Sequence, residues 1–209
     1  MMNTLQKITT LSCVILLSAF SLVAAININD NDEDNATAWE IDRAHSAINF
    51  TISHFFTPVD GTFTDYDATV HFDPENLEES SIDITIPVSS VNTRNQRRDG
   101  HLLSEDFFNA EKWPNIHFVS NTIESLGDNK FVAKGEMTIR DVTKEFELPF
   151  TLAGSMDHPM QENTIVAGIT AQTELMRTDF GVGVGDWAAT AVVGDEVDIQ
   201  LNLELNTSK

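Results

Sequence analysis

The chain has 209 residues, with 33 acidic and 12 basic side chains and a formal net charge of −21 at pH 7. Nucleic acid and anionic membrane surfaces repel so acidic a protein, so both are poor candidates as partners. The acidity favours a solvated surface over a specific cationic or basic partner. The single cysteine, Cys13, lies near the start of the chain, and the rest of it contains neither a CxxC redox motif nor a thiolate metal site.

Residues 1–25 have the pattern of a secretory signal peptide. Lys7 precedes an apolar run from Leu11 to Val23, which ends in small residues suited to cleavage after Ala25. The run is too short for a comfortable membrane span, and Cys13 stands too early in it for a lipid anchor. We therefore expect a soluble periplasmic protein with no cysteine, stabilised by its core alone.

The segment that follows, residues 26–38, is polar, acidic and without periodicity, which predicts a flexible leader. A calcium loop is the alternative, but its glycine and its final spaced glutamate are missing. Residues 39–206 are then expected to fold as one domain, long enough for one sizeable core.

Period-two alternation dominates this domain and predicts half-buried β-strands. From Ser46 to His54, apolar side chains occupy every second position, and the terminal residues 197–205 repeat the pattern. Further strands are expected within residues 61–72, 81–88, 116–123, 130–140, 146–152 and 164–175. The residues Gly127-Asp-Asn129 predict a hairpin turn. About eight such strands indicate an all-β fold whose sheet closes around an apolar interior.

One helix is expected, between Asn95 and Phe108, as a short crossover interrupted by Gly100. The same region mixes ionisable groups with bulky aromatic residues. Asp99 and His101 there are candidates to meet the polar end of a ligand at the barrel mouth. The alternative is that the aromatic side chains seal one end of the barrel and the polar residues only cap turns.

The remaining candidate motifs are weaker indications of function. Six histidines are present, but none stands at HxH or HExxH spacing, so a structural or pocket-lining role is favoured over a metal site. A long-range site that joins His54 and His101 stays an alternative. Residues 181–185, Gly-Val-Gly-Val-Gly, lack the lysine of a phosphate-binding loop and predict a rim loop. Arg177 is expected to pair with Asp179 or Asp99, with a ligand clamp as the alternative.

Several segments together resemble the YceI-like family of exported bacterial proteins. The matching motifs begin with Trp39-x-Ile-Asp-x-x-His45-Ser-x-Ile-x-Phe-x-Ile-x-His54, Gly61-x-Phe63, Ser90-Val-Asn-Thr93 and Asp99-x-His101-Leu-x-Ser104-x-Asp106-Phe-Phe108. They continue with Trp113-Pro-x-Ile116-x-Phe118-x-Ser120, Gly135-x-Met-Thr138-Ile-Arg140, Arg177-x-Asp-Phe-Gly181 and Val193-Gly-Asp-Glu-Val197. Their order spans the mature domain, and Asp141 departs from the glycine common in the family.

The resemblance implies a single lipocalin-like, eight-stranded antiparallel β-barrel with a short helical crossover, whose tunnel holds a polyisoprenoid or similar amphiphile. Family members are generally periplasmic, often homodimeric, and linked to isoprenoid quinone handling or stress responses. No catalytic residues are established for the family, so the resemblance implies a lipid carrier or store rather than an enzyme. It implies no metal and no cofactor besides the bound lipid.

Strand parity predicts which side chains face the tunnel, and the mouth residues complete the expected ligand-binding set. The apolar wall is predicted to contain Ile48, Phe50, Ile52, Phe72, Ile84, Phe118, Phe146 and Phe150, and the polar contacts are predicted to be His54, Asp99, His101 and Arg177. Two alternatives stay open: a metal-assisted hydrolase or isomerase that acts in the barrel, and a barrel packed solid by phenylalanine that acts through a protein partner.

Overall fold

The computed structural model describes residues 36–209. The predicted signal peptide, and the leader except for its last three residues, lie outside the described residues. Eleven strand segments, one α-helix and three 3₁₀ turns follow one another along the described chain. The strands are β1 Ala38–Ile41, β2 Ala47–His54, β3 Thr57–Phe63, β4 Asp67–His71, β5 Ser81–Pro87, β6 Val91–Asn92, β7 Asn115–Gly127, β8 Lys130–Ile139, β9 Val142–Asp157, β10 Thr164–Met176 and β11 Val193–Ser208.

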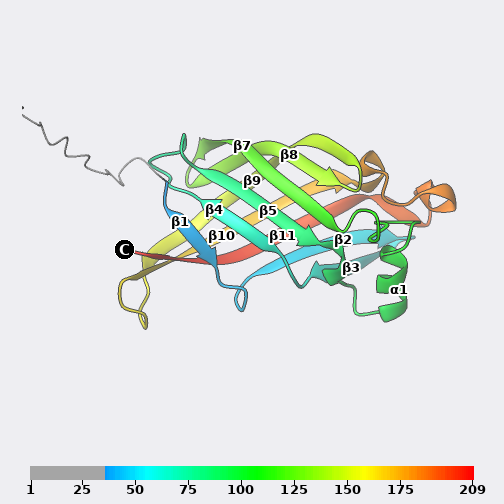
Figure 1. Ribbon diagram of the computed structural model, residues 1–209, viewed down its shortest axis with the longest axis horizontal. Coiled ribbons are helices and arrows are strands. Elements are labelled where there is room, and N and C mark those ends of the chain that lie inside the picture. Colours follow the sequence, from blue (N-terminus) through cyan, green and yellow to red (C-terminus); the bar gives the residue numbers. More distant parts are fainter. Residues whose placement is uncertain (1–35) are drawn as a thin grey trace, which may run out of the picture. The chain divides into compact units, whose positions relative to one another are not determined.

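These segments combine into eight strands of one closed antiparallel barrel (Figure 1). β1 and β2 both pair with β11 and together act as one interrupted strand. The next interrupted strand consists of β4, which pairs with β1, and β3, which pairs with β2. β5 and β6 complete the third interrupted strand, because they pair with β4 and β3. β7 to β11 then follow in sequence order, so the predicted all-β, eight-stranded barrel is confirmed.

Local details follow the alternation with one difference. The hairpin expected at Gly127–Asn129 is confirmed: Asp128 and Asn129 form a two-residue loop, both with positive φ as a type I′ turn requires. The single strand expected over residues 61–72 is wrong, since the pairing breaks between Phe63 and Asp67. Arg43 reaches into this break and donates a hydrogen bond to the Tyr66 carbonyl.

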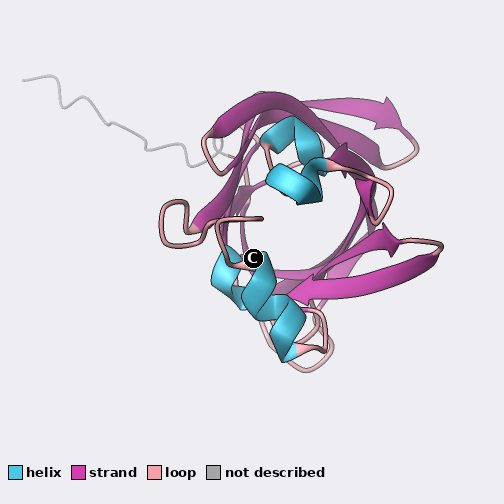
Figure 2. Ribbon diagram, turned by 90° about the vertical axis from the view of Figure 1, so that its right-hand side faces the viewer, coloured by secondary structure: helices cyan, strands magenta, loops and turns pink. Residues whose placement is uncertain are grey.

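The helix α1 spans Gln96–Leu102, and Gly100 lies inside it rather than interrupting it. Asn95 caps its first turn, because the Asn95 side chain accepts a hydrogen bond from the Arg98 N–H. The 3₁₀ turns η2 Arg177–Phe180 and η3 Gly185–Ala188 lie in the connection from β10 to β11, while η1 Val88–Ser90 joins β5 to β6. Figure 2 looks at the barrel end that carries α1, with helical turns beside the ring of strands.

The interior is filled more tightly at the opposite end. Phe72, Phe131 and Phe150 are buried there, with ring centroids 5.0 to 5.4 Å apart. Such edge-to-face and stacked pairs are favourable aromatic geometries. Phe72 and Leu205 are among the most completely buried side chains, and the Trp39 indole donates a hydrogen bond to the Phe72 carbonyl. This aromatic plug, defined as Phe72, Phe131 and Phe150, fills part of the barrel interior away from α1.

Candidate ligand-binding cavity

A cavity of about 590 Å³ lies in the half of the barrel that carries α1. Its walls come from the end of β2, from β3 and α1, from the start of β7 and the ends of β8 and β10, from the start of β11, and from the loops between these elements. The lining residues are Phe50, Ile52, Ser53, His54, Val59, Phe63, Thr93, Asn95, Arg97, Arg98, His101, Leu102, Phe107, Phe108, Ile116, Ile139, Leu175, Arg177, Val182, Trp187, Val193, Val197 and Ile199. Its volume lies within the range of about 300–1,000 Å³ typical of small-molecule sites.

Aromatic side chains form much of the cavity wall. Phe50 packs against Phe63 with ring centroids 5.5 Å apart, and Phe63 in turn meets Phe108 at 6.4 Å. Phe50 is placed by Gly61, its partner across β2 and β3: a Cβ at Gly61 would come 2.2 Å from the Phe50 ring. The absence of a side chain at Gly61 therefore lets the Phe50 ring lie flat against the neighbouring strand.

The rim of the cavity is polar and is organised around α1. Arg98 donates from Nε to the Thr93 hydroxyl and from Nη2 to the Thr93 carbonyl, each at 2.7 Å. Asp99 accepts hydrogen bonds from the N–H and the hydroxyl of the same Thr93. The helix is thereby fastened to the end of β6, and Arg97 and Arg98 line the cavity beside it.

His101 stands at the same rim in an aromatic setting. Its ring meets Phe107 and Trp187 edge-on, with centroids 5.0 and 4.9 Å away. Its Nε2 lies 3.0 Å from an Asp106 carboxylate oxygen. The ring is therefore fixed in orientation by three neighbours while it borders the cavity.

Arg177 is the most deeply buried cation among the described residues, with 3% of its surface exposed. Its guanidinium donates hydrogen bonds to the backbone carbonyls of Val182, Val193 and Gly194 at 2.7 to 3.0 Å. The expected ion pair with Asp179 or Asp99 is wrong, because these carbonyls take its hydrogen bonds and Asp179 pairs with Lys144 instead. Burial lowers the pKa of Arg177 below its usual value, and nearby Asp195 opposes this shift.

The glycines of residues 181–185 serve this arrangement. Gly181, Gly183 and Gly185 all have positive φ, and a Cβ at Gly183 would come 2.1 Å from the Arg177 Nη1. The segment is a tight loop at the cavity rim, as predicted, and it contributes Val182 to the lining. Its glycines supply left-handed backbone and room for the arginine.

The predicted ligand-binding residues fall into three places. Phe50, Ile52, His54, His101 and Arg177 line the cavity together. Ile48, Ile84, Phe118 and Phe146 pack in the core beside it, and Phe72 and Phe150 belong to the aromatic plug. Asp99 is held by Thr93 and is not among the lining residues.

The sequence interpretation missed several lining residues. Val197 and Ile199 share the strand parity of Leu201, so the alternation at the start of β11 could have identified them. Trp187 carries no such signal, because it lies in an irregular loop and reaches the cavity only through the fold of η3. Arg97 and Arg98 likewise carry no such signal, because they lie in a short polar helix with no apolar periodicity.

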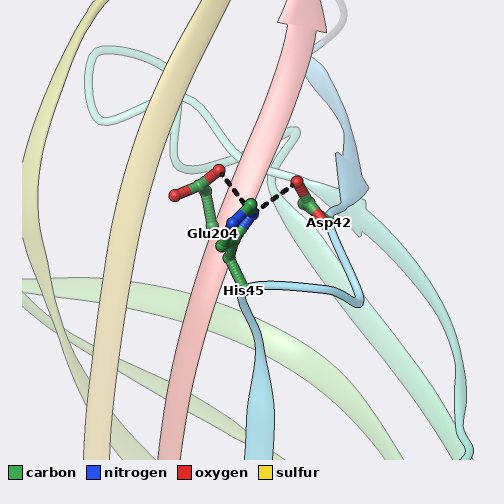
Figure 3. Close-up of side chains that lie close together, drawn as sticks. All are labelled: Asp42, His45 and Glu204. Carbon is green, nitrogen blue, oxygen red and sulfur yellow. Dashed lines mark hydrogen bonds and ion pairs between the residues drawn. The ribbon is translucent and has the colours of Figure 1, made fainter.

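Metal-ligating side chains converge elsewhere. Asp42, His45 and Glu204 place one ligand atom each within 4.8 Å of the others, and Figure 3 shows both carboxylates turned toward the His45 ring. The His45 Nδ1 lies 2.9 Å from Asp42 and 3.5 Å from Glu204. Hydrogen bonding to Asp42 raises the pKa of His45, and the same contact lowers the pKa of Asp42. The three side chains form a partly exposed ion-paired cluster at the break between β1 and β2.

The cavity histidines differ from this cluster. His54 and His101 border the cavity, but neither belongs to a group of three metal-ligating side chains within residues 36–209. The second such group in these residues, Glu174, Glu196 and Asp198, consists of exposed carboxylates on β10 and β11. In the described part of the chain, no helix is both long and apolar enough to cross a membrane.

Comparisons with known proteins agree with this architecture. The YceI-like domain model matches residues 39–205. Protein YceI of Escherichia coli O17:K52:H18 is 33% identical over 172 residues, which cover 81% of this chain and 86% of that protein.

Solved structures extend the comparison. The crystal structure of Burkholderia cenocepacia BcnA is 28% identical, with a TM-score of 0.70 over 79% of this chain and 99% of that one. The Campylobacter jejuni YceI protein is 30% identical, with a TM-score of 0.64 over 73% and 87% of the two chains. A polyisoprenoid binding domain from Saccharophagus degradans shares the fold at 11% identity, with a TM-score of 0.58 over 82% and 99%. The closed barrel, the match along residues 39–205 and these likenesses show that the chain belongs to the YceI-like family.

Proposed function

We propose that the protein is a periplasmic carrier or store that shields the apolar chain of a polyisoprenoid, or of a similar amphiphile such as an isoprenoid quinone, from water. The observation that carries this proposal is the 590 Å³ cavity with its phenylalanine walls and polar rim. A barrel packed solid by its own side chains, the alternative considered from the sequence, would leave no such volume.

The size of the cavity bounds the cargo. At about 30 Å³ for each water-sized group, 590 Å³ holds roughly 20 carbon atoms, which corresponds to about four isoprene units. Each buried methylene contributes about 0.8 kcal/mol, so each five-carbon unit contributes at most roughly 4 kcal/mol before the costs of association. Affinity therefore comes from the chain, while the polar rim selects the head group.

A structural relative supports the same ligand class. The Saccharophagus degradans domain is described as polyisoprenoid binding. At 11% sequence identity, this likeness by itself supports only a shared fold. The ligand class for this chain is therefore proposed from the cavity and from membership of the family. No side chain is assigned a catalytic role, and the proposal is a binding function rather than an enzymatic one.

The direct test is native mass spectrometry of protein purified from its own host, followed by solvent extraction of the same sample. We expect one bound species per chain whose fragments show repeating five-carbon units. A clean apo mass, with no uptake of added farnesol or geranylgeraniol, would contradict the proposal. Treatment with EDTA should leave the lipid content unchanged, whereas a metal-assisted enzyme would lose its activity.

A further inference from the structure

The two-residue loop between β2 and β3 consists of two exposed phenylalanines. His54 pairs with Thr57, so Phe55 and Phe56 form the hairpin tip. Phe56 is fully exposed, and Phe55 is 57% exposed. Large apolar side chains in water are unfavourable, and loops of this length normally carry glycine, asparagine or aspartate. The tip therefore exposes apolar side chains that are normally buried, and it lacks the residues that two-residue hairpin loops prefer.

The backbone of this tip is strained. Phe55 has a φ of 53°, in the left-handed region that costs energy for any residue with a side chain. Its N–H donates to the Val192 carbonyl at 2.8 Å, and its ring meets the His54 ring at 4.7 Å. The strained conformation is thus held in place by its neighbours. Strain that is held in this way is a signature of functional positions.

The tip stands at the mouth of the cavity. His54 and Val59, on the two strands of the hairpin, both line the cavity. Figure 1 shows the β2–β3 hairpin reaching the barrel end that carries α1. A molecule that enters or leaves the cavity at this end passes beside Phe55 and Phe56.

The charge of the segment narrows the choice of partner. Residues 44–59 contain no Asp, Glu, Lys or Arg, although 45 of the 209 residues (12 basic and 33 acidic) are charged. The apolar tip favours a partner with an apolar interior that it can enter. The net charge of −21 favours a partner whose surface carries no net negative charge, because such a surface does not repel the protein. A zwitterionic lipid bilayer meets both conditions and accepts a protruding ring without a preformed pocket.

We propose that Phe55 and Phe56 dock the cavity mouth on a zwitterionic lipid bilayer, so that an amphiphile passes between membrane and cavity without crossing water. The purpose of this docking rests on the proposed carrier function. The docking itself is a property of the hairpin tip and is measurable with vesicles that contain no isoprenoid.

The test is flotation of the purified protein with phosphatidylcholine vesicles. The wild type is expected to float with the vesicles, and Phe56→Asp is expected to reduce the bound fraction at least tenfold. Met160→Asp is the matched control, because Met160 is 86% exposed in the loop between β9 and β10 at the opposite end of the barrel (Figure 1). This control is expected to float like the wild type.

A second variant separates docking from misfolding. The double variant Phe55→Gly, Phe56→Asn places glycine at the loop position with positive φ, as a type II′ turn favours, and relieves the strain at Phe55, so it should be at least as stable as the wild type. It is expected to lose vesicle binding all the same. Vesicles with added phosphatidylglycerol should bind the wild type more weakly at low salt, and salt should restore binding by screening the repulsion.

The proposal is overturned if the wild type does not float, or if Phe56→Asp floats equally well. It is also overturned if the wild type is a dimer that Phe56→Asp dissociates and neither form floats, because the tip would then be a protein interface. Uptake of farnesol from solution needs no membrane. A protein that floats but takes up no farnesol contradicts the carrier function alone, and one that takes up farnesol without floating contradicts the docking alone.

Discussion

At the scale of single residues, Gly61 decides how the cavity wall packs. A Cβ at Gly61 would overlap the Phe50 ring, so Gly61→Ala must push that ring into the cavity. We expect a loss of stability of about 1–3 kcal/mol, typical of overpacking, together with weaker binding of long chains. Urea denaturation and ligand titration measure the two effects.

Two further variants interpret that result. Gly168→Ala is the control, because its Cβ would meet only the Ala153 side chain at 3.7 Å, an ordinary contact. The pair Phe50→Leu with Gly61→Ala should recover part of the lost stability. Equal destabilisation by both alanine substitutions would contradict the steric explanation.

The ion pair of His45 predicts a pH dependence of stability. Its pKa is raised in the folded protein from 6.5, chiefly by the hydrogen bond to Asp42, so its contribution is complete below pH 6.5 and is lost as the pH rises through the raised pKa. The pKa of Asp42 is lowered from 3.8, so that contribution is present above pH 3.8 and is lost in acid. Thermal denaturation should therefore show a small decrease in Tm above pH 6.5.

The effect is small because the pair is exposed to solvent. His45→Gln should remove the decrease in Tm above pH 6.5. The matched control is His71→Gln, since His71 forms no ion pair with any residue from 36 to 209. An unchanged pH profile in His45→Gln would show that other groups cause the decrease.

At the scale of elements, the connection from β10 to β11 is organised by one side chain. Arg177 begins η2 and donates to carbonyls at Val182, Val193 and Gly194, so it joins the rim loop to the start of β11. Arg177→Met leaves these buried acceptors without their charged donor, and we expect a loss of about 3 kcal/mol in the free energy of unfolding. Denaturation in urea measures it.

The chemistry of the guanidinium supplies the control. Arg177→Lys should recover less than half of that loss, because an ammonium does not reproduce the planar fork of an arginine. Arg43→Lys alters a half-exposed cation and should change stability by less than about 1 kcal/mol. Full recovery by Arg177→Lys would mean that the charge, rather than the fork, holds the loop.

At the scale of the whole molecule, the cavity lies in the half of the barrel toward α1, and the aromatic plug fills part of the interior beyond it. Affinity should therefore rise with isoprenoid length up to about 20 carbon atoms and then level off, because further units find no apolar volume. Titration with alcohols of 10, 15, 20 and 40 carbons measures this dependence. A steady rise to 40 carbons would show instead that Phe72, Phe131 and Phe150 move aside.

The sequence by itself determined most of the strands and the hairpin at Asp128 and Asn129, because alternation and turn chemistry are local signals carried by neighbouring residues. The family and its eight-stranded barrel followed from the order of the matching motifs along the chain. Strand parity also predicted correctly that Phe50 and Ile52 lie in the cavity wall. Parity says which side chains point inward, but it does not say which half of the barrel they fill.

Only the tertiary structure decided that Phe72 and Phe150 pack against Phe131, whereas Phe50 borders open volume. It also decided that Trp187 reaches the rim and that Arg177 binds carbonyls rather than a carboxylate. The physical reason is that cavities and buried hydrogen bonds depend on the combined volume and geometry of side chains from many strands, which no single segment specifies.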